Sequence, residues 1–163
     1  MPAIVRFASQ LDTSSLAELR WLSRSMQEQD REALSAFAPR FGLWLSDALA
    51  SGAWNVAVAQ VAGGPVGCMY LRKVETVPVP GVDARAWGYV TAAFVKESHR
   101  NGGIGREMLA HLILRAREIH LTELHVWPST RAVSLYVRAG FLSPEQQRAS
   151  GDPDEPSYVL PLM

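Results

Sequence analysis

The feature that most constrains the fold is a glycine-rich link between a strand-like run and a long amphipathic helix. Residues 87–95 (WGYVTAAFV) are strongly β-like and apolar on both faces, which suits a central strand covered on both sides. The link at 100–106 has three glycines in four positions, which permit positive φ and close backbone approach. Apolar residues then recur on one helical stripe: Ile104, Met108, Leu109, Leu112, Ile113, Ala116 and Ile119. A strand, a tight link and a helix predict an α/β fold.

The first half of the chain predicts a strand, two helical regions and a hairpin. Residues 3–8 are β-like, and residues 11–15 offer helix caps before apolar residues at helical spacing. A second helical region runs from about Asp30 to Gly52, and we expect a break or kink near Pro39. The turn signal Gly63-Gly64-Pro65 separates two strand-like runs and predicts a β-hairpin.

The second half predicts a loop at 75–85, a strand at 123–127, a helix at 129–139 closed by Gly140, and a last strand at 158–162. Residues 143–156 are polar and proline-rich, and we interpret them as a solvated loop, with a mobile flap as the alternative. Helices that follow strands imply partly parallel pairing. The expected architecture is a single mixed α/β domain over residues 1–163.

Composition excludes several function classes. Sixteen basic and sixteen acidic residues cancel, so the chain lacks the broad basic field of a non-specific nucleic-acid binder. The single cysteine, Cys68, excludes an internal disulfide framework and a multi-cysteine zinc site, and we expect no metal. No signal peptide and no apolar run of about 18 residues are present, so we expect no membrane contact and a cytoplasmic location.

The glycine link has the properties of an anion site. The first turn of a helix has free N–H groups and a partial positive charge, so the link predicts a phosphate cradle, flanked by Arg100 and Arg106. A tight turn without any ligand is the alternative. Two nucleotide fingerprints fail, because Gly105 is not followed by Lys-Ser/Thr and because Met108 stands where a dinucleotide motif needs glycine.

Two sequence blocks together resemble the GNAT N-acetyltransferase superfamily. The pattern Arg100-x-x-Gly103-x-Gly105 before an amphipathic helix is similar to that family's acetyl-CoA motif. Residues 124–127 and 131–141 resemble its C-terminal block, where a strand precedes a helix with an Ala-x-x-Leu-Tyr core closed by Gly-Phe. The resemblance implies a GNAT fold, with a central mixed, mostly antiparallel sheet flanked by about four helices.

The resemblance also implies acetyl-CoA as cofactor and assigns the residues that bind it. In this family the pantetheine arm pairs with main-chain groups at the end of the central strand, which Phe94 and Val95 match. The pyrophosphate lies on amides of the loop and helix start. The matching positions are Arg100, Asn101, Gly102, Gly103, Ile104, Gly105 and Arg106.

Tyr136 matches the family's frequent general acid. When an amine attacks the thioester, coenzyme A leaves as a thiolate, which a tyrosine hydroxyl can protonate. An ordinary packed helix tyrosine is the alternative. Ser129 stands where many relatives have asparagine before the helix, and we place it among the cofactor-binding residues; a helix cap alone would also explain it.

The general base and the acceptor are less defined. Residues 87–95 contain no carboxylate where some relatives place a glutamate. Other groups that could take the proton are Glu28, Asp30, Glu32, Glu75, His111 and His125, each with an ordinary structural explanation. Direct attack by the free-amine fraction, through Thr91 or Tyr89 and ordered water, is the alternative. Aromatic and apolar residues in the regions that form the family's acceptor site are Trp21, Met26, Phe37, Phe41, Trp44 and Tyr158, for most of which core packing is the simpler explanation.

The resulting prediction is an enzyme that transfers acetyl from acetyl-CoA to a primary amine of a small molecule or peptide, by direct attack in a ternary complex. The alternative is a non-catalytic acyl-CoA-binding module on the same fold. Cys68 lies within a strand-like run and is interpreted as a small buried hydrophobe rather than an acyl carrier. Exposed strand edges are compatible with a homodimer.

Overall fold

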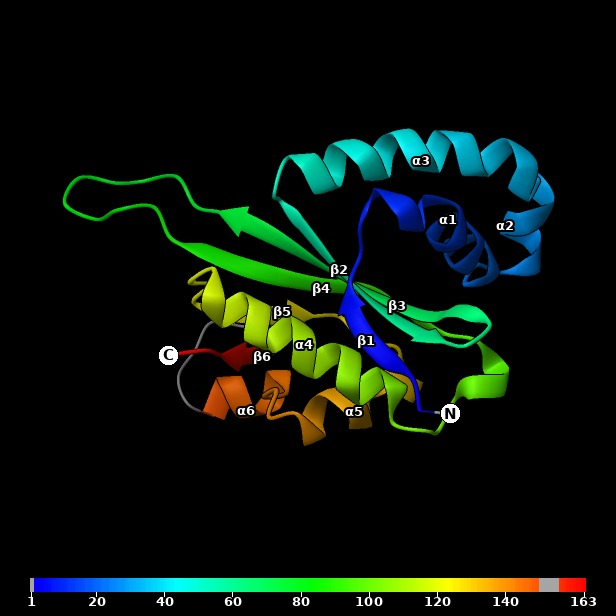
Figure 1. The fold of residues 1–163 in the computed structure, drawn as a ribbon. Coiled ribbons are helices and arrows are strands. Elements are labelled where there is room, and N and C mark those ends of the chain that lie inside the picture. Colours follow the sequence, from blue (N-terminus) through cyan, green and yellow to red (C-terminus); the bar gives the residue numbers. More distant parts are fainter. Residues whose placement is uncertain (1, 150–155) are drawn as a thin grey trace. The chain divides into compact units, whose positions relative to one another are not determined.

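A computed structural model of the chain describes residues 2–149 and 156–163. Its strands form one six-stranded sheet in the order β1-β2-β3-β4-β5-β6 (Figure 1). The strands are β1 (Ile4–Phe7), β2 (Trp54–Val61), β3 (Gly64–Glu75), β4 (Ala86–Val95), β5 (Glu123–Val126) and β6 (Tyr158–Pro161). Pairing is antiparallel for β1 with β2 and for β5 with β6, and parallel for β4 with β5. The predicted mixed sheet is confirmed.

The longest helices are α1 (Thr13–Leu22), α3 (Leu34–Ala50) and α4 (Ile104–Glu118). Shorter helices are α2 (Met26–Arg31), α5 (Val133–Arg138) and α6 (Pro144–Ala149), with single 3₁₀ turns η1 (Gln10–Asp12), η2 (Glu97–His99) and η3 (Thr130–Ala132). None of the helices in the described part of the chain is long and apolar enough to cross a membrane.

The fold divides into two compact units that share the long strands β3 and β4 and the helix α4. The first contains Met1–Tyr70 and Ala92–Leu112, and the second contains Leu71–Thr91 and Ile113–Met163. Whether the whole chain acts as one domain stays a prediction.

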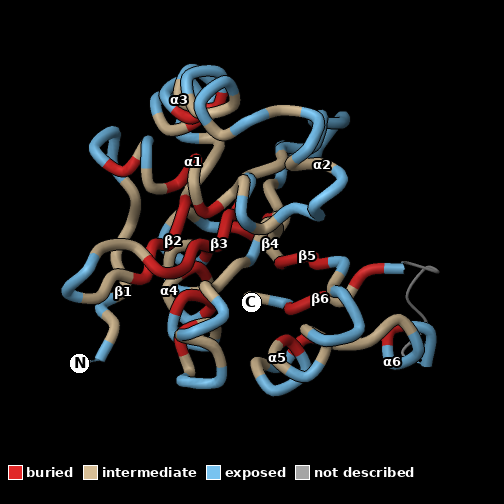
Figure 2. Tube along the Cα trace, turned by 90° about the vertical axis from the view of Figure 1, so that its right-hand side faces the viewer, coloured by how far each residue is buried: buried red, intermediate tan, exposed pale blue. Residues whose placement is uncertain are grey.

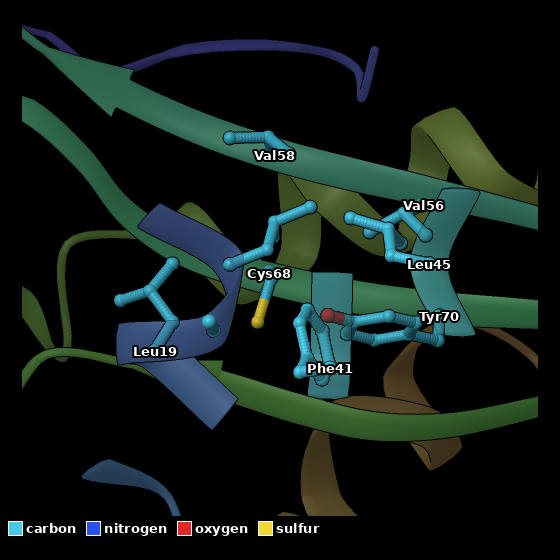
Figure 3. Packing of buried hydrophobic residues seen from close by; sticks show 9 residues of the cluster. Leu19, Phe41, Leu45, Val56, Val58, Cys68 and Tyr70 are labelled. Atoms are coloured by element: carbon cyan, nitrogen blue, oxygen red, sulfur yellow. The ribbon is translucent and has the colours of Figure 1, made fainter. Parts of the chain in front are cut away.

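The core of the first unit lies between the sheet and the helices α1 and α3. Figure 3 shows side chains from both helices, β2 and β3 meeting in one apolar cluster. Its buried members are Leu16, Ala17, Leu19, Phe41, Leu45, Val56, Val58, Cys68 and Tyr70. The predicted buried position of Cys68 is confirmed, at 1% exposure.

The start of α1 is organised by a polar cluster rather than by the predicted caps alone. Ser9 caps η1 and forms a capping box with Asp12. Asp12 also takes two hydrogen bonds from the Arg6 guanidinium, at 2.9 and 2.7 Å. Arg6 lies on β1, so this pair ties the edge strand to the entry of α1. These interactions hold the pKa of the Asp12 carboxyl below its usual value, and the Arg6 hydrogen bond contributes most.

Three sequence expectations about local structure need correction. A break or kink was expected near Pro39, and α3 continues through it without a break, with Phe41 and Leu45 beyond the proline buried in the core. That burial offsets the one backbone hydrogen bond that proline removes. Residues 144–149, expected to be loop, form α6, with Gln147 buried. The flap alternative concerned a segment that includes 150–155, which lies outside the described residues.

The third correction concerns β4, which is not covered evenly on both faces. Burial alternates along its first half: Gly88 and Val90 are buried, whereas Tyr89 and Thr91 are half-buried. Figure 2 shows how buried and exposed segments are distributed along the described chain. Such alternation is typical of a strand with one face on the core.

The core of the second unit packs against the buried face of β4 and β5. A Cβ atom at Gly88 would lie 2.5 Å from Leu124 Cδ2, 2.7 Å from Leu71 Cδ1 and 2.9 Å from Leu121 Cδ1. Glycine is therefore required for these leucines to approach the strand so closely. Other buried apolar residues of this unit are Ala116, Val126, Tyr136, Phe141, Val159 and Leu160.

Candidate active site

The glycine link forms a tight turn that ends at the first residue of α4. Asn101 and Gly103 both have positive φ, 63° and 85°. The first helical hydrogen bond runs from the Glu107 N–H to the Gly103 carbonyl, at 3.0 Å. The backbone N–H groups of the first turn thus have no partner within the helix, and they carry the positive end of the helix dipole. This geometry matches the predicted anion cradle.

Arg100 is bound to the end of β4. Its Nε–H donates to the Val95 carbonyl at 2.9 Å, and its guanidinium lies 5.8 Å from the centre of the Phe94 ring. The Nε–H contact fixes the loop against the strand. The expected contact of the Arg100 guanidinium with a phosphate stays a prediction. A carbonyl oxygen has two lone pairs, so Val95 can still accept a second hydrogen bond.

Gly67 on β3 lets the strand end and the helix come close together. A Cβ atom there would lie 3.1 Å from the Phe94 carbonyl oxygen, 3.3 Å from Met108 Cε and 3.3 Å from Val95 Cγ2. The link, the end of β4 and the first turns of α4 are therefore packed as one group in the first unit. Of the predicted cofactor-binding residues, the structure brings together Phe94, Val95, Arg100, Asn101, Gly102, Gly103, Ile104, Gly105 and Arg106.

The strand β4 has an irregular backbone just before this group. Ala92 has a φ of 51°, in the left-handed region that non-glycine residues rarely adopt. The pairing of β4 with β5 joins Gly88 to Leu124 and Tyr89 to His125. Phe94 and Val95 lie beyond this paired stretch. Residues held in such backbone conformations cluster at functional sites, which marks this part of β4 as a candidate.

Comparison with known proteins decides the family. The family model described as Acetyltransferase (GNAT) family matches residues 14–141. The chain belongs to the GNAT family. The resemblance seen in its two sequence blocks is confirmed, and the chain is an acetyltransferase that uses acetyl-CoA.

Solved structures of GNAT proteins share its fold. A predicted acetyltransferase from Clostridium acetobutylicum, solved with acetyl-CoA, has a TM-score of 0.70 at 18% identity, covering 86% of this chain and 90% of that one. A GCN5-related N-acetyltransferase from Ralstonia eutropha JMP134 has a TM-score of 0.66 at 26% identity, covering 86% and 92%.

A GNAT-family N-acetyltransferase from Escherichia coli, solved with CoA, has a TM-score of 0.69 at 18% identity, covering 100% of this chain and 83% of that one. No curated protein gives a significant match. The similarity to solved structures therefore carries the fold, and the substrate has to be argued from this chain's own residues.

Tyr136 and Ser129 lie in the second unit. Tyr136 is 2% exposed, and its ring meets Phe141 edge-on at 5.4 Å between centres. Burial raises the pKa of the Tyr136 hydroxyl to about 12, so the phenol keeps its proton at neutral pH. Ser129 precedes η3, but its side chain makes no capping hydrogen bond. The cap that would have explained Ser129 is thus absent, and its role as a cofactor contact stays a prediction.

Two of the three acidic residues proposed as bases from the first helices, Glu28 and Glu32, are held in ion pairs, and the third, Asp30, lies on α2. Glu28 takes hydrogen bonds from Arg24 and Ser25, which lower the pKa of its carboxyl to about 2. Glu32 is paired with Arg40, which lowers the pKa of that carboxyl as well. A carboxylate with a lowered pKa is a weaker proton acceptor. The interpretation of these residues as solvated helix termini is supported.

Three further base candidates, Glu75, His111 and His125, also have contacts with neighbouring groups. Glu75 is paired with Lys73 at 2.8 Å, and this contact lowers the pKa of its carboxyl. His111 lies with Nδ1 3.2 Å from the Glu107 carbonyl of its own helix. His125 is buried, with a partner at each ring nitrogen.

Most acceptor candidates of the first unit form a packed aromatic row. Phe37, Phe41 and Trp44 contact one another in sequence, with centres 5.5 Å apart at each step. Trp44 continues to Trp54 at 5.4 Å. Trp21 donates its indole N–H to the Glu32 carbonyl at 2.9 Å. Core packing accounts for Phe41, which is 7% exposed, whereas Trp44 is 41% exposed and is not explained by core packing alone.

The sequence analysis missed one polar group. The His125 ring joins buried Ser157, whose Oγ lies 2.8 Å from Nδ1, to Glu123, whose Oε1 lies 2.7 Å from Nε2. The available signal was the alternation Glu123-x-His125-x-Trp127, which places all three side chains on one face of a strand. Ser157 follows the segment that had been interpreted as loop, so nothing in the sequence connected it with His125.

Proposed function

We propose that this enzyme transfers the acetyl group of acetyl-CoA to a primary amine, by direct attack of the amine nitrogen on the thioester carbonyl. The observation that carries the proposal is the cradle at residues 100–106, where a left-handed turn opens the first turn of α4 beside the end of β4. Main-chain N–H groups there suit the cofactor's pyrophosphate. Phe94 and Val95 offer main-chain groups to the pantetheine arm.

Direct attack is favoured because the single cysteine cannot act as an acyl carrier. Cys68 is 1% exposed, and burial raises the pKa of its thiol to about 12. The thiolate is the nucleophilic form, so a thiol with this pKa is inert near neutral pH. No acetyl-cysteine intermediate is then available, and the amine must meet acetyl-CoA in a ternary complex.

Tyr136 is the proposed proton donor to the departing coenzyme A. In the reaction the amine nitrogen forms a bond to the carbonyl carbon and gives up one proton to water, while the C–S bond breaks. The sulfur takes a proton from the Tyr136 hydroxyl, which water then reprotonates. Burial raises the pKa of the Tyr136 phenol, so its hydroxyl carries the proton at neutral pH. Ser129 is proposed as a further contact to the cofactor.

Thermal unfolding with and without acetyl-CoA tests the cofactor site. Ligand at about 100 times its dissociation constant adds roughly 2.7 kcal/mol to the free energy of unfolding. For a chain of this size, that corresponds to a rise in Tm on the order of 5–10 °C.

A pair of matched variants locates the site. Gly103→Asp places a carboxylate at a position of positive φ within the cradle and should abolish the rise in Tm. Gly63→Asp makes the same change in the hairpin turn, where nothing lies within 4 Å of the new Cβ, and should leave the rise intact. Equal rises in both variants would refute the cradle.

Tyr136→Phe tests the proton donor. The variant keeps the ring that packs on Phe141, so the fold and the acetyl-CoA-dependent rise in Tm should persist. Loss of a general acid should lower kcat by roughly 10²–10⁴-fold. Thiol release with a panel of amines measures this rate. An unchanged kcat would remove Tyr136 from the mechanism.

A further inference from the structure

One face of the second unit carries side chains that cofactor binding does not use. Tyr89 on β4 pairs with His125 on β5, so their side chains lie on the same face of the sheet. The rings on this face contact one another: Trp87 and His125 at 4.7 Å, Tyr89 and Trp127 at 5.3 Å, and His125 and Trp127 at 6.2 Å. We call these four rings, together with Glu123, the aromatic face.

The aromatic face is not the core of the unit. The opposite face of the same strands packs Leu124 and its neighbours against Gly88. On the aromatic face, by contrast, Trp127 is 48% exposed and the Glu123 side chain is 42% exposed. A large exposed aromatic ring beside a carboxylate is a feature that folding alone does not require.

Hydrogen bonds hold the Glu123 carboxylate in place. A carboxylate only accepts hydrogen bonds, so the 2.7 Å contact requires that His125 Nε2 carries the proton and donates it to Oε1. Nδ1 of a neutral ring then accepts from the hydroxyl of Ser157, which is fully buried. The carboxylate is thus oriented by His125, which itself contacts the Trp87 and Trp127 rings.

We infer that the aromatic face binds the acetyl acceptor, and that this acceptor is a primary amine with an aromatic side group, held as its ammonium ion. The inference rests on the proposed acetyl transfer to an amine. The ammonium ion is attracted by the Glu123 carboxylate and by the negative faces of the aromatic rings. It gives up one proton to water before its nitrogen attacks the thioester. The aromatic side group of the acceptor packs edge-on or offset against Trp127 and Tyr89. An anionic acceptor would be repelled by the same groups.

Isothermal titration calorimetry on the full chain with excess coenzyme A tests the inference. The ligands are 2-phenylethylamine, which is a cation, and 2-phenylethanol, which has the same ring and length but no charge. Wild type should bind the amine about ten-fold more tightly than the alcohol, as expected for a cation between a carboxylate and aromatic rings.

Two variants separate the charge from the rings. Glu123→Gln can still accept from His125 through its amide oxygen, so the fold is kept, and it should bring the amine's affinity down to that of the alcohol. Trp127→Leu should weaken both ligands by a similar factor. Glu118→Gln removes another exposed carboxylate, on α4, where its partner is Arg115, and should change neither affinity.

The inference is overturned if 2-phenylethylamine does not bind, if the alcohol binds as tightly as the amine, or if Glu123→Gln has no more effect than Glu118→Gln. These results leave the proposed function untouched, because the acetyl-CoA-dependent rise in Tm and thiol release with other amines are measured separately. Conversely, a missing rise in Tm with intact amine binding would overturn the proposed function and keep the cation site.

Discussion

Replacing Gly88 with alanine should destabilise the protein by an amount that follows from three distances. The new Cβ atom would lie 2.5 Å from Leu124 Cδ2, 2.7 Å from Leu71 Cδ1 and 2.9 Å from Leu121 Cδ1. All three leucines are buried, at 0%, 0% and 2% exposure, so none can move aside into solvent. Overpacking of this kind costs about 1–3 kcal/mol.

Part of this cost is returned by the unfolded chain, because alanine restricts it more than glycine does. That effect contributes about 0.4–1 kcal/mol, so the net loss should be about 1–2 kcal/mol. At roughly 2–4 °C per kcal/mol, Tm should fall by about 2–8 °C. Urea unfolding gives the free energy directly.

Gly63→Ala is the matched control, since nothing lies within 4 Å of the Cβ atom that it adds. Its stability should equal or slightly exceed that of wild type. A double-mutant cycle with Leu124→Ala adds a second check, because the shortened side chain makes room for the new methyl group. The two changes should therefore cost about 1 kcal/mol less together than the sum of their separate effects. A Gly88→Ala variant as stable as Gly63→Ala would refute the reasoning.

Two further predictions concern single buried groups. Asp12→Asn should cost about 1–3 kcal/mol at neutral pH, measured by urea unfolding, because Arg6 loses its charged partner. The folded state lowers the pKa of Asp12, so this stabilisation is present above the unfolded pKa and is lost as pH falls through the folded pKa. The difference in free energy of unfolding between wild type and variant should therefore shrink in acid. A difference that stays constant with pH would contradict the assignment. The Cys68 thiol should not react with Ellman's reagent at pH 8 until the protein is unfolded in urea, whereas rapid reaction of the folded protein would show that the thiol is accessible.

Backbone-level features of this chain could be predicted because local chemistry determines them. A glycine cluster between an apolar strand and an amphipathic helix can form few structures other than a tight turn. The positions of the link and of α4 were therefore predicted correctly. The hairpin of β2 and β3 was predicted for the same reason, since its turn residues leave little choice. Helix propensity predicted a break at Pro39 that does not occur, because burial of Phe41 and Leu45 outweighs the cost of a proline within the helix.

Side-chain partnerships depend on three-dimensional neighbours and could not be predicted. The hydrogen bond from Arg100 Nε to the Val95 main-chain carbonyl could not be read from the sequence, because the turn of the loop brings the two groups together. Ser157 and His125 are 32 residues apart in sequence, and only the pairing of β5 with β6 brings them together. The partner of His125 therefore lies in a distant segment, and no pattern of neighbouring residues could have predicted it.

The same distinction explains why the cofactor of this enzyme can be assigned before its acceptor. Phosphate and pantetheine are met largely by main-chain groups, which a protein at 18% identity can present in the same fold. An acceptor, in contrast, is recognised by side chains, and the side chains of β5 point alternately to the two faces of the sheet. Leu124 and Val126 face inward and are committed to the core, so their identity reports on stability alone. Glu123 and Trp127 on the aromatic face are free of that requirement. We therefore expect the charge of Glu123 and the shape of Trp127 to determine which amines this enzyme prefers.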